Sequence, residues 1–163
     1  MGSLRAAIIV AATAAIAAGV DLLTKAIAAD RLSDGSVHAL LPGLDLKLAF
    51  NHGISFSLLP AYEPATLAFL LAFQGALTGL VSWLAFRADG LAERLGLALV
   101  TGGALGNLLD RWRHGGVTDW IDLHPAGSHW FTFNLADAWI SVGVVLLVRD
   151  AIMTSRDDVR GRA

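Results

Sequence analysis

Long runs of apolar residues alternate with shorter polar segments along this chain of 163 residues. A membrane-spanning helix needs about 20 predominantly apolar residues. Four runs approach or exceed that length, at residues 4–29, 65–86, 95–112 and 135–153. The last one reaches it only if Arg149 snorkels toward the lipid surface. The pattern predicts an all-α membrane protein with four transmembrane helices, in one polytopic domain covering residues 1–163.

The first run has a competing interpretation, because Arg5 precedes an Ala-rich stretch as in a cleavable signal peptide. The run is longer than the apolar core of such a peptide, and it carries Asp21 and Lys25 late in its length. On a helix, residues spaced i,i+4 lie on one face and can neutralise each other. We therefore expect a retained helix in which Asp21 and Lys25 form an ion pair.

The first long polar segment, residues 30–64, has features of β-structure. Pro42-Gly43 is a turn signal, and Leu44–Phe50 alternates loosely between polar and apolar residues, as a half-buried strand does. Asn51-His52-Gly53 ends this strand. Ile54–Leu59 is either another strand or a short helix on the membrane surface.

The second polar segment, residues 113–134, is interrupted by Gly115-Gly116 and by residues 125–127. We expect this segment to be exposed. Residues 87–94 are expected to form a polar loop, and residues 154–163 a loose tail. Tryptophans flank the second segment, as in the aromatic belt at a membrane surface. They are Trp112, Trp120, Trp130 and Trp139.

Composition supports a membrane protein. The chain is 55% hydrophobic and only 16% charged, against about 25% charged for typical soluble domains. A mean hydropathy of +0.61 agrees. The net charge of −2 and the lack of a basic run give no reason to expect a nucleic-acid partner. The chain has no cysteine, which excludes disulfides, a thiol nucleophile and Cys-ligated metals.

The distribution of Lys and Arg predicts the orientation. Seven lie at or near the two chain ends and in the 87–94 loop, against four in or next to the two polar segments, namely Arg31, Lys47, Arg111 and Arg113. Positive residues favour the cytoplasmic side, so both termini are expected there.

Polar residues within the predicted spans gather at one depth. The first and third spans run toward the extracytoplasmic side and carry their polar residues near their C-terminal ends. The fourth span runs back toward the cytoplasm and carries its acidic residue near its N-terminal end. These residues are Asp21, Lys25, Asn107, Asp110, Arg111 and Asp137. Charged residues are costly in a bilayer and usually serve a function or have a partner. The clustering predicts a site near the extracytoplasmic face.

Two acids at this boundary, Asp119 and Asp137, could form a catalytic pair. Two carboxyls within a few Å share one proton near neutral pH. The ionised member can then accept a proton from water while the protonated member donates to a carbonyl oxygen. Alternatively, they are solvated loop and helix-cap acids, which their positions alone leave open.

Four ordered blocks resemble the lipoprotein signal peptidases, also called signal peptidase II, which are intramembrane aspartyl endopeptidases. They are residues 21–25 (DLLTK), 51–56 (NHGISF), 102–111 (GGALGNLLDR), and 117–121 (VTDWI) followed by 133–137 (FNLAD). Each block is weak alone, but their order and spacing together are highly specific. Two positions depart mildly from the pattern: Trp120 stands where Phe or Tyr is usual, and Ser55 where Ala is common.

The resemblance implies that Asp119 and Asp137 are catalytic. It implies that other residues shape the pocket or bind the substrate, namely Asn51, Gly53, Gly103, Asn107, Arg111 and Asn134. Asp21 and Lys25 would brace the site, with Asp110 as further structural support. It also implies that residues 30–64 form a small extracytoplasmic β-cradle with a short surface helix.

The implied substrates are prolipoproteins cleaved just before a diacylglyceryl-modified cysteine. The expected location is the bacterial cytoplasmic (inner) membrane, with a monomer in contact with lipid. No cofactor or metal is implied.

Other interpretations accompany several of these residues. Asp110 and Arg111 could simply pair with each other, and Asp122 is expected to be a solvated loop acid. Lys25 could suggest a Ser–Lys protease, although the nearest serines, Ser33 and Ser36, lie in a turn-rich segment. A metal site is disfavoured because the candidates lack ligand-pair spacing. They are His114, His124 and His129 with Asp122.

Two other functional classes remain open from the sequence. Intramembrane acids also mark ion pathways, as in a small proton-coupled carrier; a carrier site, however, usually lies near the midplane. A non-catalytic lipoprotein-binding or assembly factor would tolerate loss of either acid.

Overall fold

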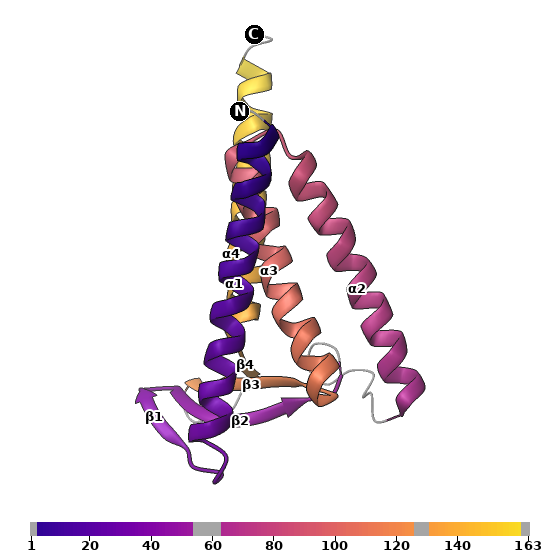
Figure 1. Ribbon diagram of the computed structural model, residues 1–163. Coiled ribbons are helices and arrows are strands. Elements are labelled where there is room, and N and C mark those ends of the chain that lie inside the picture. Colours follow the sequence, from indigo (N-terminus) through magenta and orange to yellow (C-terminus); the bar gives the residue numbers. More distant parts are fainter. Residues whose placement is uncertain (1–2, 54–62, 126–130, 161–163) are drawn as a thin grey trace.

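A computed structural model gives four long helices and one small antiparallel sheet (Figure 1), and it describes residues 3–53, 63–125 and 131–160. The mostly helical fold with a small sheet is therefore confirmed. In chain order the elements are α1 (Ser3–Arg31), β1 (His38–Leu41), β2 (Leu44–Asn51), α2 (Pro64–Arg87), α3 (Leu91–His114), β3 (Val117–Leu123), β4 (Phe131–Phe133) and α4 (Leu135–Arg160).

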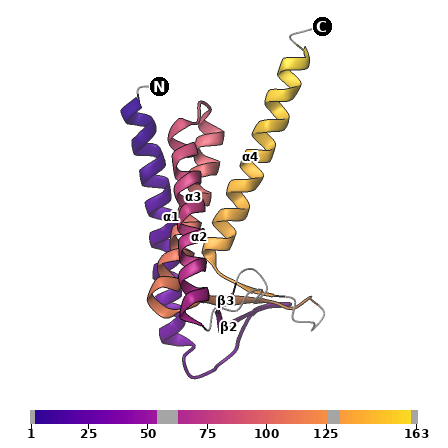
Figure 2. The same cartoon turned by 90° about the vertical axis from the view of Figure 1, so that its right-hand side faces the viewer.

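The helices run between two distinct ends of the molecule. Both chain ends lie at one end and the sheet lies at the other, as Figures 1 and 2 show. Helix α3 contacts each of the other three helices. In Figure 1, α2 meets α3 near the chain termini and diverges from it toward the sheet. By length and composition, α1 from Leu4 to Arg31 and α2 could each cross a membrane.

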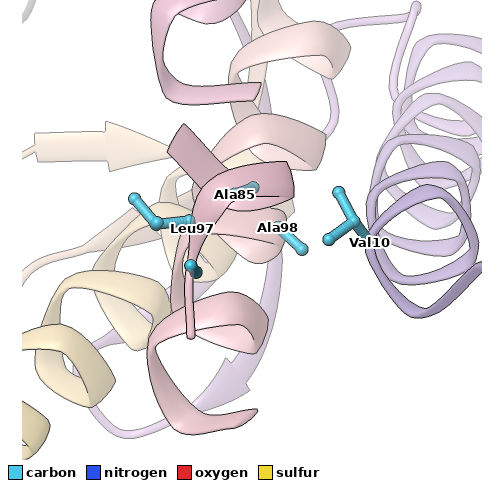
Figure 3. Packing of buried hydrophobic residues seen from close by; sticks show 5 residues of the cluster. Val10, Ala85, Leu97 and Ala98 are labelled. Atoms are coloured by element: carbon cyan, nitrogen blue, oxygen red, sulfur yellow. The ribbon is translucent and has the colours of Figure 1, made fainter. Parts of the chain in front are cut away.

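Small residues allow the helices to pack closely. Near the chain termini, Val10, Ala85, Leu97 and Ala98 form a buried cluster (Figure 3). Further along α3, a Cβ at Gly102 would lie 2.7 Å from the carbonyl oxygen of Ala14. Since real Cβ atoms essentially never come so close, a larger residue would push α1 away from α3. The Gly-rich third run thus serves helix packing, as its composition predicts.

The sheet has the strand order β1-β2-β3-β4. Strand β2 confirms the strand predicted at Leu44–Phe50. Pro42-Gly43 forms the turn between β1 and β2, where Gly43 has φ of +83°. That angle favours glycine, and proline before it is typical of a type II turn.

Strands β3 and β4 lie in the second polar segment, for which the sequence pattern predicted exposure but no particular secondary structure. Strand β3 pairs with β2, with Ala49 opposite Asp119. The partner of β3 therefore lies about 70 residues earlier in the chain. A local pattern of polar and apolar residues carries no sign of such a distant pairing.

Two expectations about boundaries are wrong. Helix α3 already begins at Leu91, so the loop before it is short, and the Arg94 guanidinium folds back to donate to the Ala88 carbonyl. The C-terminal tail continues α4 as far as Arg160. Residues 154–160 contain no glycine or proline to stop a helix. The predicted surface helix at Ile54–Leu59 falls outside the described residues.

Candidate active site

Asp119 and Asp137 line one cavity of about 880 Å³. Asp119 comes from β3 and is only 5% exposed, while Asp137 lies in the first turn of α4. The cavity is bounded by α2, α3, α4 and the sheet. The tertiary fold therefore brings these two acids, 18 positions apart in the sequence, to a common space.

Asn134 connects the two carboxyls. Its Nδ2 donates to Asp119 Oδ1 at 2.6 Å, and its backbone N–H donates to Asp137 Oδ2 at 3.3 Å. In return, the Asp137 backbone N–H donates to Asn134 Oδ1 at 3.1 Å. This reciprocal pair of bonds is a capping box at the start of α4. Asp137 is thus a helix-cap acid that also faces the cavity, and its position follows from the local sequence Asn-Leu-Ala-Asp.

The environment of Asp119 favours its protonated form. Burial, followed by the nearby charge of Asp137, raises the pKa of Asp119 to about 7. Hydrogen bonding from Asn134, the charge of Lys25 and hydrogen bonding from Asn51 each oppose this rise. At neutral pH, Asp119 therefore holds a proton for a substantial fraction of the time. This is the state that a shared-proton pair requires.

Lys25 is the centre of a buried polar cluster behind the two acids. Its Nζ lies 2.8 Å from Asp21 Oδ2, which confirms the predicted ion pair. The same ammonium donates to Asn107 Oδ1 at 2.7 Å, and Asn107 Nδ2 donates to Asp137 Oδ1 at 3.1 Å. Because Lys25 can only donate, it fixes which end of the Asn107 amide faces Asp137.

Asp21 links α1 to the start of α4 as well. Its Oδ1 accepts the backbone N–H of Ala136 at 2.8 Å. A carboxylate at a helix N-terminus satisfies an otherwise unpaired N–H and interacts favourably with the helix dipole. Asp21 therefore helps to set the position of the first turn of α4, which carries Asp137.

The possible pairing of Asp110 with Arg111 is not found. Asp110 instead accepts the backbone N–H of Thr118 at 2.6 Å, contacts His114 Nδ1 at 2.8 Å and lies 3.7 Å from Lys25 Nζ. Consecutive helical residues point about 100° apart, so the two side chains diverge. Asp110 thereby ties the end of α3 to the strand that carries Asp119.

Arg111 extends into the cavity wall. Its Nη1 donates to Gln74 Oε1 and its Nη2 donates to the Gly53 carbonyl, both at 2.6 Å. Gly53 in turn donates its N–H to Asn51 Oδ1 at 3.0 Å. Arg111, Gly53 and Asn51 all line the cavity, together with Asn107. The contact with Gln74 was not foreseen from the sequence, although Gln74 is the one strongly polar side chain of its apolar run.

Two residues predicted at the pocket lie behind it, since neither is among the residues lining the cavity. A Cβ at Gly103 would lie 2.9 Å from Ile140 Cγ1 and 2.5 Å from the Ala136 carbonyl oxygen, so Gly103 packs against α4. Asn134 is fully buried and contacts the two acids. Both residues can position Asp137 without touching a ligand.

Asp122 is not the solvated loop acid that was expected. It is 1% exposed and lies 2.7 Å from Lys47 Nζ, in a cross-strand position opposite Asp45. His124 Nε2 is 3.0 Å from Asp45. Carboxylate oxygens of Asp45 and Asp122 and a ring nitrogen of His124 thus lie within 4.8 Å of one another. The Lys47 ammonium already supplies a cation to this cluster through its contact with Asp122.

Of the other histidines considered as metal ligands, His114 contacts Asp110 instead of this group. His129 lies outside the described residues.

Comparisons with known proteins agree with this architecture. The family model described as signal peptidase (SPase) II matches residues 13–153. Lipoprotein signal peptidase from Burkholderia mallei (strain SAVP1) is 39% identical over 137 residues, covering 83% of this chain and 82% of that protein. The lipoprotein signal peptidase of Coxiella burnetii (strain RSA 331 / Henzerling II) is 39% identical over 136 residues, covering 82% and 83%.

Two solved bacterial membrane enzymes have similar folds. One has a TM-score of 0.79 at 24% identity, covering 91% of this chain and 90% of the solved one. The other has a TM-score of 0.74 at 25% identity, covering 87% and 91%. The fold is therefore that of a bacterial membrane enzyme. The chain belongs to the signal peptidase II family, the lipoprotein signal peptidases, as its sequence blocks predict.

Proposed function

We propose that this protease is an aspartic endopeptidase that cleaves prolipoproteins just before their diacylglyceryl-modified cysteine. The observation that carries this proposal is the meeting of Asp119 and Asp137 at one cavity, joined through Asn134. The matched relatives are lipoprotein signal peptidases, which supports a lipoprotein substrate for this chain.

In the proposed reaction, Asp137 begins ionised and Asp119 begins protonated. Asp137 lies in the first turn of α4, where its Oδ1 accepts a hydrogen bond from Asn107 Nδ2. Burial favours the neutral form of Asp119. Asp137 accepts a proton from water, whose oxygen attacks the scissile carbonyl carbon. Asp119 gives its proton to the carbonyl oxygen.

The tetrahedral intermediate then collapses. Asp137 delivers its proton to the departing nitrogen, the C–N bond breaks, and Asp119 recovers the proton of the hydroxyl oxygen. The products are an amine and a carboxylic acid, and both acids return to their starting states. No cofactor takes part in these steps.

The remaining site residues divide by location. Arg111, Asn51 and Gly53 line the cavity and are placed to hold the substrate backbone. The others keep the two acids in position, with Asn107 also lining the cavity. They are Asp21, Lys25, Gly103, Asn107, Asp110 and Asn134.

We further propose that all four helices cross the bacterial cytoplasmic membrane, as one polytopic domain acting as a monomer. The sheet would form a cradle on the extracytoplasmic side, with both termini in the cytoplasm. Many large apolar side chains on α1, α2 and α4 are exposed, as a surface facing lipid requires. The distribution of Lys and Arg favours this orientation. The acyl chains of the substrate would then stay in the lipid while the peptide enters the site.

The test replaces each acid separately, as Asp119→Asn and Asp137→Asn, in purified protein incubated with a lipidated prolipoprotein. Each change should abolish cleavage while the protein still inserts and folds. Asp30→Asn is a matched control, because that side chain is 82% exposed and is not among the residues that line the cavity. Cleavage by either well-folded variant would remove that residue from the catalytic role. If the parent protein bound the substrate but did not cleave it, the result would instead favour a non-catalytic lipoprotein-binding factor.

A further inference from the structure

Gln74 is a polar residue in the largely apolar α2 wall of the cavity, where Thr78 is the other polar lining residue. The cavity-lining neighbours of Gln74 on α2 include Leu70, Phe73 and Leu77. Placing an amide in apolar surroundings costs free energy unless its polar atoms make hydrogen bonds. Neither the catalytic chemistry nor the family resemblance gives this side chain a role.

Arg111 determines how the Gln74 amide is oriented. Arg111 Nη1 lies 2.6 Å from the amide, and a guanidinium has donors only. The amide atom facing Arg111 must therefore be the acceptor, Oε1. The guanidinium is itself held by its second bond, from Nη2 to the Gly53 carbonyl at 2.6 Å.

With Oε1 directed to Arg111, the Gln74 Nε2 is left as a two-proton donor. Within residues 3–53, 63–125 and 131–160, no acceptor is found for it. Because Gln74 lines the cavity that contains Asp119 and Asp137, this donor is available to a ligand bound there. The bond to Arg111 holds the amide in one orientation, which lowers the entropy lost when a ligand binds.

We propose that Gln74 is a substrate-binding residue that donates a hydrogen bond from Nε2 to an uncharged carbonyl oxygen of the lipidated peptide. This inference rests on the proposed function. The carbonyl belongs either to the peptide backbone near the scissile bond or to an ester of the diacylglyceryl group. Both are neutral acceptors, and both enter a cavity whose α2 wall is otherwise largely apolar.

Two substitutions separate this role from simple support of Arg111. Gln74→Met removes both hydrogen-bonding groups while keeping similar volume. Gln74→Glu keeps an oxygen for Arg111 but replaces the donor Nε2 by a second acceptor. Each variant should raise KM by about tenfold, which corresponds to the loss of roughly one hydrogen bond to the substrate. The kcat of each variant should stay within about twofold of the parent value. Leu80→Met is the matched control, since Leu80 lies on α2 but does not line the cavity.

A residue that only supports Arg111 would give a different result: Gln74→Glu would match the parent while Gln74→Met was impaired. That outcome would overturn the proposal. A KM for Gln74→Met equal to that of the parent protein would overturn it as well. Thermal unfolding of every variant separates loss of binding from loss of folding. Gln74→Asn, which keeps the amide on a shorter side chain, provides a further comparison if Gln74→Met unfolds.

A substrate with ether-linked chains in place of the esters identifies the carbonyl. If the ester accepts the bond, Gln74→Met loses its effect on this substrate; if the peptide accepts it, the tenfold effect persists. Equilibrium binding of the lipidated peptide is also measured in Asp137→Asn, with and without Gln74→Met, and a tenfold weaker affinity is expected. Cleavage by Asp137→Asn alone would overturn the proposed mechanism while leaving the KM comparison for Gln74 valid.

Discussion

Replacing Asp119 by Asn should make the protein inactive yet more stable at alkaline pH. Burial and the charge of Asp137 raise the pKa of Asp119 from an ordinary value of 3.8 to about 7. The folded state therefore binds the proton more tightly than the unfolded state does. This contribution to stability is complete at low pH and is lost as the pH rises from about 4 to about 7. An asparagine at this position cannot ionise and avoids the loss.

The size of the effect follows from the pKa difference. Each pKa unit corresponds to about 1.4 kcal/mol, so the full difference amounts to about 4 kcal/mol. Coupling to Asp137 means that part of this free energy belongs to the pair, so we expect about 2–4 kcal/mol at pH 8. The Asn side chain can still accept the bond from Asn134 Nδ2, so the main hydrogen bond is kept.

The assay is thermal unfolding of the parent and of Asp119→Asn in detergent at pH 4.5, 6 and 8. The gain in unfolding temperature should grow with pH, reaching about 5–10 °C at pH 8. Asp30→Asn should show no such trend, because its carboxyl is 82% exposed. An Asp119→Asn variant whose advantage did not increase with pH would refute the assigned protonation state.

Four other predictions follow from the same contacts. Lys25→Met should destabilise the fold by about 3–5 kcal/mol in unfolding experiments, because it leaves the Asp21 and Asp110 carboxylates buried beside each other. Gly106→Ala should also destabilise, since its Cβ would collide with Asp21, whereas Gly79→Ala on α2 meets nothing within 4 Å and should be neutral or stabilising by up to about 1 kcal/mol. Cleavage should decline above about pH 7 in a pH–rate profile, as the raised-pKa acid loses its proton. Chelators should not inhibit; inhibition reversed by zinc would contradict this mechanism.

Hydrophobic patterning predicted the helices well because backbone groups in apolar surroundings must be satisfied within the helix itself. The four predicted runs therefore became α1 to α4 with only their ends displaced. The i,i+4 pair of Asp21 and Lys25 was also predictable, since helical geometry alone brings the two side chains together. Asn134 followed three positions later by Asp137 is likewise a local signal, since it allows a capping box at the start of a helix.

Local patterns failed where distant segments had to meet. The existence of β3 depends on hydrogen bonds to β2, so its own residues gave little indication of a strand. Asp122 was interpreted as exposed because its partner, Lys47, belongs to that other strand. The end of α4 differs from the prediction for another reason. The polar residues after Met153 predict a loose tail, whereas the helix continues to Arg160 because no glycine or proline interrupts it.

The sequence by itself determined the family, the helices and the identity of the two acids singled out for catalysis. Only the tertiary structure decided that Asp119 and Asp137 share a cavity, that Lys25 reaches Asp137 through Asn107, and that Arg111 turns the amide of Gln74. The physical reason is the separation along the chain between the residues that must contact one another. Helix periodicity and capping depend on residues a few positions apart, whereas these contacts depend on how closely whole helices approach, which the glycines of α3 and the volumes of many side chains set together.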